Sequence, residues 1–161
     1  MIRTVGMGLI FVAMLTVSRY IEAGRLRQLR EEEAWLRFLS ALHRELSCYA
    51  RPLSAFAATY EDETLGAVGF PDRLREAATL GDALCAVRGR LASSPPFLRV
   101  LEAFGASFGR GYRDGELHAL AAAIDEAGAI YKKEEEDAPR RRRLSRTLCV
   151  SLSLAIVMLL L

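Results

Sequence analysis

The chain has 161 residues, of which 22 are basic and 20 acidic, so its formal net charge is +2. Charges that almost cancel give no reason to expect a nucleic-acid partner. The three cysteines have no spacing that indicates a disulfide framework or a metal site, and we expect them to be reduced and buried.

The charges are confined to the middle of the chain. Apart from Arg3, every Lys, Arg, Asp and Glu lies between Arg19 and Arg146. Residues 1–18 and 144–161 are therefore almost entirely apolar. A helix of that length comes close to the roughly 30 Å of hydrocarbon that a transmembrane helix must cross. We expect both segments to be transmembrane helices.

Each terminal segment has an alternative interpretation. The first could be a cleaved signal peptide, because its apolar run has a suitable length and Arg3 supplies a positive start. However, Thr16 to Tyr20 has no small-x-small cleavage pattern. The second could be a core helix, but such a helix normally has a polar face. Residues 149–161 offer only Ser151 and Ser153 for one.

Arginines flank both segments on the side of the central region. Because positive charge beside a span is retained in the cytoplasm, residues 19–143 are predicted to form a cytoplasmic domain. Part of this positive charge is expected to lie at the membrane surface, near anionic lipid headgroups. These candidate membrane-surface residues are Arg25, Arg27, Arg30, Arg140, Arg141, Arg142 and Arg143.

The central region is predicted to be helical throughout. Apolar residues recur every three or four positions, and no stretch alternates over the length of a strand. The first helix is predicted to begin after Gly24 and to end near Ala50. Pro52 then opens a short second helix. Residues 61–69 are predicted to form a polar, glycine-containing connection.

Phe70 restarts the helical pattern, and Gly81 is expected to divide the following region into two short helices. Ser94 is a favourable N-cap for the next helix. Gly109 and Gly111 can end that helix with positive φ.

The longest helix of the domain is predicted to begin at the cap Asp114. It ends in a run of mixed charge, Lys132 to Asp137, which is typical of a solvated face. Pro139 is expected to break or kink the chain before the last segment. The fold class is therefore all-α: a single helical bundle between N- and C-terminal transmembrane helices.

A search for catalytic or ligand-binding patterns finds none. His43 and His118 lie on different predicted helices, outside any metal-binding motif. The acidic runs 31–33 and 134–137 are expected on solvated helix faces, without the apolar pocket that a catalytic carboxylate needs. The glycines within 105–115 lack the strand and the Gly-Lys-Ser/Thr of a phosphate loop. We therefore predict no enzyme, no cofactor and no metal.

Several local patterns occur in an order that is informative. The first helix of the domain ends in Glu45 to Tyr49, and Arg51 to Ala55 follows it. Leu101 to Gly105 then leads through a glycine turn to Asp114, and the charged helix Ile130 to Asp137 precedes a leucine-rich end. In this order, across nearly the whole chain, the sequence resembles the stage III sporulation protein AB family. The segment Arg51 to Ala55 looks like the family's Pro-Leu-x-x-Ala segment.

The resemblance implies a fold, a location and a function. The family consists of small membrane proteins of endospore-forming bacteria, encoded with an ATPase and other components of a mother-cell-to-forespore channel. Its soluble part is similar to the helical cytoplasmic domain of type II secretion and type IV pilus platform proteins. The implied function is a non-enzymatic assembly platform that couples to the ATPase and other membrane proteins in the mother-cell membrane around the forespore. Platform proteins carry this domain twice, so the single copy is compatible with a homo-oligomer.

If the coupling role holds, charged residues in exposed turns are the expected partner-facing positions. These are Glu61, Asp62 and Glu63 on one loop, and Arg110, Arg113 and Asp114 on another. The alternative function is a two-span membrane regulatory or adaptor protein unrelated to sporulation.

Overall fold

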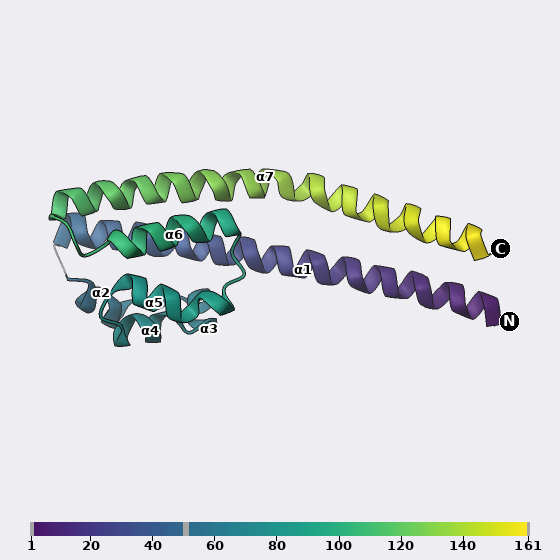
Figure 1. Ribbon diagram of the computed structural model, residues 1–161, viewed down its shortest axis with the longest axis horizontal. Helices are drawn as coiled ribbons and strands as arrows, with labels where there is room; N and C mark the ends of the chain where they lie inside the picture. Colours follow the sequence, from purple (N-terminus) through teal and green to yellow (C-terminus); the bar gives the residue numbers. More distant parts are fainter. Residues whose placement is uncertain (1, 50–51, 161) are drawn as a thin grey trace. The chain divides into compact units, whose positions relative to one another are not determined.

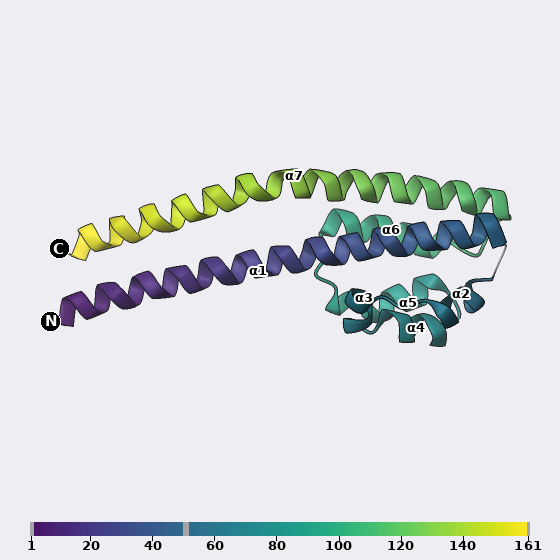
Figure 2. The ribbon, with the colours of Figure 1, turned by 180° about the vertical axis from the view of Figure 1, so that it is seen from behind.

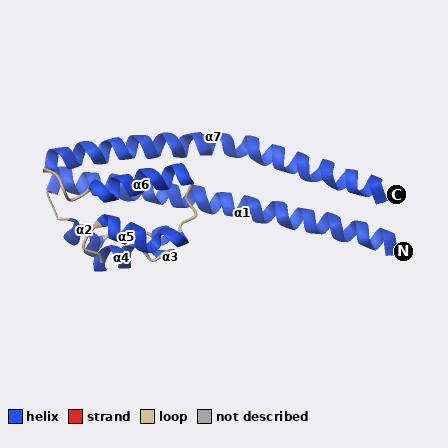
Figure 3. Ribbon diagram, viewed as in Figure 1, coloured by secondary structure: helices blue, strands red, loops and turns tan. Residues whose placement is uncertain are grey.

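The computed structural model describes residues 2–49 and 52–160. The described residues form helices and loops without any strand, which confirms the predicted all-α class (Figure 3). In chain order the elements are α1 (Ile2–Arg44), a π-helical turn (Glu45–Tyr49), α2 (Leu53–Thr59), α3 (Glu63–Ala67), α4 (Phe70–Glu76), α5 (Leu80–Val87), a 3₁₀ turn (Arg88–Arg90), α6 (Pro95–Ser107) and α7 (Arg113–Leu160).

The chain divides into two compact units. The terminal unit comprises Met1–Arg27 and Glu134–Leu161, and the helical unit comprises Gln28–Lys133. Helices α1 and α7 each contribute to both units, whereas α2 to α6 belong to the helical unit alone.

The start of α1 differs from the prediction. The helix runs through Gly24 from Ile2 to Arg44 instead of beginning after this glycine. A single glycine inside a helix costs only about 1 kcal/mol, so it does not by itself stop a helix. The predicted end near Ala50 lies outside the described residues, and the π-helical turn Glu45–Tyr49 precedes it.

The core of the helical unit is built on one face of α1. Trp35, Phe38, Leu39 and Leu42 follow the spacing of a helical stripe, and each is at most 1 % exposed. Phe70 of α4 packs against this stripe, with ring centroids 4.4 Å from Trp35 and 5.0 Å from Phe38. Within this unit, α2 to α5 gather on one side of α1 (Figures 1 and 2). Aromatic packing thus joins α1 to the short helices.

A short helix occupies part of the predicted polar connection 61–69. Helix α3 forms there because the Asp62 carboxylate accepts hydrogen bonds from the backbone N–H groups of Thr64 and Leu65, at 2.9 and 3.0 Å. The Leu65 side chain is fully buried, which anchors this short helix. Gly69, with φ +80°, then turns the chain into α4.

The two short helices predicted between residues 70 and 91 are present as α4 and α5, but Gly81 does not separate them. The break occurs before Thr79, whose hydroxyl oxygen accepts a hydrogen bond from the Asp82 N–H at 3.1 Å. Gly81 lies inside α5, one residue after Leu80. The capping threonine therefore sets the start of α5.

Helices α5 and α6 cross closely at two glycines. A Cβ atom at Gly81 would lie 3.0 Å from the Gly105 carbonyl oxygen, and one at Gly105 would lie 2.6 Å from Leu84 Cδ1. The crossing thus requires residues without side chains. The predicted helix after Ser94 is present as α6, and Gly109 follows it with φ +86°.

In the terminal unit, the N-terminal part of α1 and the C-terminal part of α7 run side by side (Figures 1 and 2). Helix α7 continues through Pro139, so the chain does not break there. Among the described residues, no helix is both long and apolar enough to cross a membrane. The side chains of residues 2–11, and several after residue 144, lie outside the described part, and these belong to the predicted spans.

Candidate functional site

Two adjacent glutamates of α1 hold the segment before α6. The Glu31 carboxylate accepts hydrogen bonds from the backbone N–H groups of Ala92 and Ser93, at 2.9 to 3.0 Å, and from the Ser93 hydroxyl at 2.7 Å. The Glu32 carboxylate accepts one from the Ser94 N–H at 2.8 Å. Ser94 occupies the N-cap position, but its own side chain makes no capping bond. The glutamates therefore satisfy the backbone N–H groups of the N-cap residue and of the two residues before it, and so hold the chain where it enters α6.

The expected solvated face for residues 31–33 is wrong for two of the three. Glu31 and Glu32 are 1 % and 0 % exposed, and only Glu33 faces solvent, where it pairs with Arg37 at 3.1 Å. Glu31 accepts N–H and O–H donors, and Glu32 accepts one N–H, from a segment some 60 positions further along the chain. Glu32 also accepts a hydrogen bond from the Gln28 side-chain amide at 3.2 Å. This arrangement fastens α6 to α1.

The first predicted partner-facing loop contains one structural residue and two exposed ones. Besides capping α3, Asp62 forms an ion pair with Arg37 at 3.1 Å. Glu61 and Glu63 are exposed. Neighbouring Tyr60 packs against Phe38, and burial, followed by the negative charge of Asp62, raises the pKa of its hydroxyl above the ordinary value.

The second predicted loop has a similar division. The Arg113 guanidinium donates hydrogen bonds to the carbonyl oxygens of Leu46 and Ser47, at 2.7 and 3.1 Å, and so ties the start of α7 to the end of the first helix. Arg110 and Asp114 are exposed. The same turn presents Tyr112, which the sequence analysis did not single out and which is 93 % exposed.

The two loops lie at different levels of α1. Asp62 contacts Arg37, whereas Arg113 contacts Leu46. Arg37 lies on α1 and Leu46 in the π-helical turn that follows it, so at about 1.5 Å per residue the two positions are roughly 13 Å apart along the helical path. The loops therefore form two separate charged surfaces rather than one cluster.

The predicted membrane-surface arginines are exposed wherever their side chains are described. Those in the terminal unit are Arg25, Arg27, Arg140, Arg141 and Arg143. Arg30 belongs to the helical unit. Arg141 lies 3.5 Å from the carboxylate of Asp137, and the side chain of Arg142 lies outside the described part.

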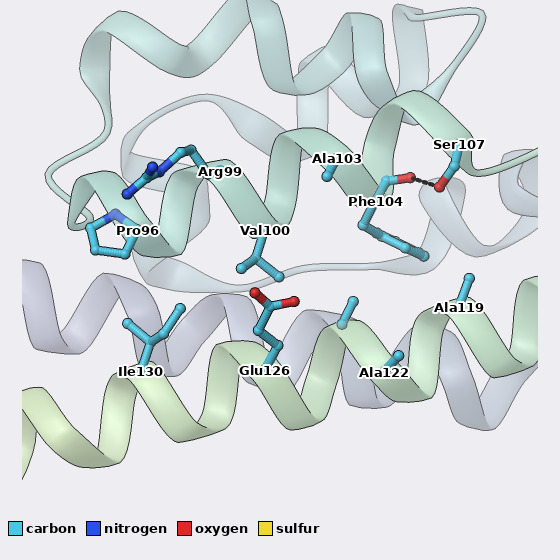
Figure 4. A pocket seen from close by; sticks show the side chains of 11 residues that line it. Pro96, Arg99, Val100, Ala103, Phe104, Ser107, Ala119, Ala122, Glu126 and Ile130 are labelled. Atoms are coloured by element: carbon cyan, nitrogen blue, oxygen red, sulfur yellow. Dashed lines mark hydrogen bonds between the residues drawn. The ribbon is translucent and has the colours of Figure 1, made fainter.

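Grooves open on the described surface of the helical unit. One, of about 470 Å³, runs between α6 and the first part of α7, with Val100 and Phe104 in its floor (Figure 4). Another, of about 420 Å³, lies beside the crossing of α5 and α6. Cys85 and Arg110 line this second groove.

The residues that most often bind metals are dispersed. Among the described residues, no group of three or more His, Cys, Asp or Glu side chains could hold a metal ion. His43 is half-buried and His118 is exposed. Cys48 and Cys85 are free and exposed, so the expectation of buried thiols is wrong for both of them. The side chain of Cys149 lies outside the described part.

Comparison with known proteins identifies the family. A family model described as stage III sporulation protein AB matches residues 3–161. No curated protein and no solved structure matches the chain. The family match includes both apolar ends and the whole helical unit. The chain therefore belongs to the stage III sporulation protein AB family.

Proposed function

We propose that this protein is a non-enzymatic membrane component of a secretion-like channel complex in sporulation, where it serves as an assembly platform coupled to a partner ATPase. The observation that carries the proposal is the family match over residues 3–161, which indicates a role in stage III of sporulation. This match favours the sporulation role over an unrelated two-span regulator or adaptor.

The proposed location is the mother-cell membrane around the forespore. It is supported by the sequence, in which residues 1–18 and 144–161 carry only Arg3 and Arg146 as charges. Both segments adjoin exposed arginines, and each arginine near an anionic bilayer surface contributes about 1 kcal/mol of attraction. The helical unit then lies on the cytoplasmic side, where an ATPase can reach it.

The proposed ATPase contact uses the charges that remain available in the two loops. Asp62 and Arg113 are occupied in holding their loops in place. The exposed positions are Glu61 and Glu63 on the first loop, and Arg110 and Asp114 on the second. Residues at such positions can be reversed in charge without removing an internal hydrogen bond of the fold.

Co-purification of the full chain with a secretion ATPase of the same organism tests this proposal. We expect the paired reversal Glu61→Lys with Glu63→Lys, or Arg110→Glu with Asp114→Lys, to weaken binding about tenfold or more. Asp125→Lys, an exposed reversal on α7 outside both loops, is the matched control and should bind normally.

Wild-type protein that does not bind the ATPase would contradict the coupling role. Normal binding by both loop variants would contradict the assignment of the contact to these loops. A salt-dependent loss confined to one pair would identify the loop that carries the contact.

A further inference from the structure

The groove between α6 and α7 has a small-residue rim over an apolar floor. Val100 and Phe104 are at most 8 % exposed and lie in the floor, whereas Ala103, Ala119 and Ala122 are exposed along the two walls (Figure 4). Alanines on both walls allow the backbone of another helix to approach closely. Exposed helix positions are usually occupied by charged or polar residues. Three exposed alanines along this groove therefore indicate a surface against which another helix packs.

The two charged residues of the groove are opposite in sign and lie on opposite walls. Arg99 belongs to α6 and Glu126 belongs to α7. Figure 4 shows them at neighbouring levels along the groove, with Pro96 and Ile130 towards one end and Ala119 towards the other. Both are exposed, and neither takes part in an ion pair within the part of the chain that the structure describes.

This charge pattern is complementary to itself. Helices α6 and α7 are joined by a short turn and run antiparallel, so they form a hairpin (Figure 1). Rotating a second hairpin by 180° about an axis parallel to the helices places its α6 over the first α7, at the same level along the groove. Arg99 of each copy then faces Glu126 of the other. A rotation axis perpendicular to the helices would instead carry Arg99 towards the alanine end, where it meets no acidic residue of the groove.

We propose that the α6–α7 groove is a self-association surface, in which two copies of this chain pack their hairpins into a four-helix bundle. Every neighbouring pair of helices in this bundle is antiparallel, and each apolar groove becomes part of a shared core. Two Arg99–Glu126 pairs at the edge fix the axis of the dimer, and the alanine rim sets the close helix spacing. The surface is distinct from the two loops assigned to the ATPase.

The test is a charge exchange followed by measurement of self-association. The full-length protein is purified in detergent, and its dimer dissociation constant is measured by energy transfer between differently labelled copies. Arg99→Glu and Glu126→Arg each place like charges together, and each should raise the dissociation constant about tenfold. The double variant restores opposite charges and should return to within about threefold of the wild type. Both substitutions keep strong helix formers.

A second pair of variants tests the groove itself. Ala122→Glu places a charged side chain in the wall and should abolish dimerisation, whereas Ala129→Glu on the same helix is exposed and outside the groove lining, and should not. A wild-type chain that stays monomeric at all concentrations overturns the proposal. So do a dimer that persists in both Arg99→Glu and Ala122→Glu, and a double charge variant that is not rescued. No ATPase is present, so these outcomes leave the proposed channel function untouched.

Discussion

Glu31 and Glu32 hold the backbone at the point where the chain enters α6. Backbone N–H groups that are shielded from water need acceptors, and those of Ala92, Ser93 and Ser94 lie ahead of the first turn of α6. The two carboxylates reach these groups from α1. Sequence alone places three consecutive glutamates on a solvated face, because the donors that bury two of them lie about 60 positions away.

Removing the first of these carboxylates should destabilise the fold strongly. Glu31→Ala removes the acceptor of the partly buried Ala92 N–H and of the buried N–H and hydroxyl groups of Ser93, at a cost of about 3 kcal/mol. Glu33→Ala is the matched control, because it removes an exposed ion pair and should change the free energy of unfolding by less than about 1 kcal/mol. Trp35 is the only tryptophan and is fully buried, so its fluorescence reports urea unfolding in detergent. Equal effects of the two substitutions would contradict the role of Glu31 in holding the segment before α6.

Tyr60 should make the stability of the helical unit sensitive to alkaline pH. The pKa of its hydroxyl is raised in the folded protein, so at high pH the unfolded chain releases this proton first, near pH 10. The contribution of Tyr60 is therefore fully present below about pH 10 and is lost as the pH rises further. Between about pH 9 and 11 the free energy of unfolding should fall more steeply for the wild type than for Tyr60→Phe, by up to about 1.4 kcal/mol per pH unit. Parallel curves for the two proteins would show that Tyr60 keeps its ordinary pKa.

At the scale of elements, the sequence correctly predicts a helix where the interactions that start it are local in the chain. Pro52 and Ser94 correctly indicate where α2 and α6 begin, because a proline or an N-cap serine at a helix start is visible in a short window of sequence. The prediction fails at α3, where burial of Leu65 and the cap from Asp62 outweigh a glycine-containing polar composition. The prediction that Gly81 separates two helices is also wrong, because this glycine allows α5 and α6 to cross closely and does not end a helix.

Glycine-to-alanine substitutions should have opposite effects on the free energy of unfolding at Gly81, inside the crossing of α5 and α6, and at Gly128, outside it. Gly81→Ala places its Cβ 3.0 Å from the Gly105 carbonyl oxygen, which is backbone, so the helices must move apart at a cost of about 1–3 kcal/mol. Gly128→Ala meets nothing within 4 Å in α7 and should stabilise the protein by up to about 1 kcal/mol. Urea unfolding followed by Trp35 fluorescence measures both. Stabilisation by Gly81→Ala would mean that α5 and α6 do not pack as closely as described.

At the scale of the whole molecule, the distribution of charge predicted more than any single motif did. It indicated the two apolar ends and the exposed loops, because these depend on composition alone. It could not assign Asp62 and Arg113 to structural contacts, since their partners Arg37 and Leu46 lie 25 and 67 positions away. Nor could it find the α6–α7 groove, because exposed alanines resemble core alanines until the packing of both helices is known.

The proposed topology predicts that the helical unit cannot be reached by an impermeant reagent from outside the cell. With Cys48, Cys85 and Cys149 replaced by serine, Glu63→Cys places a single thiol at an exposed position of α3. The first two replacements matter because both native thiols are free and exposed. In vegetative cells that express the protein, an impermeant maleimide should label this thiol only after permeabilisation. Vegetative cells are the right host, because the far side of their membrane is open to the medium.

The matched control is Ile2→Cys, at the amino-terminal edge of the first predicted span, and this thiol should react in intact cells. Labelling at position 63 without permeabilisation would reverse the orientation deduced from the flanking arginines, and it would favour an exported domain released by signal cleavage. The mass of the mature protein separates these two cases, because cleavage removes the first span whereas a reversed orientation keeps it. Protection at position 63, together with labelling at position 2, places the helical unit in the compartment where ATP is available. Only there can the exposed charges of its loops meet an ATPase.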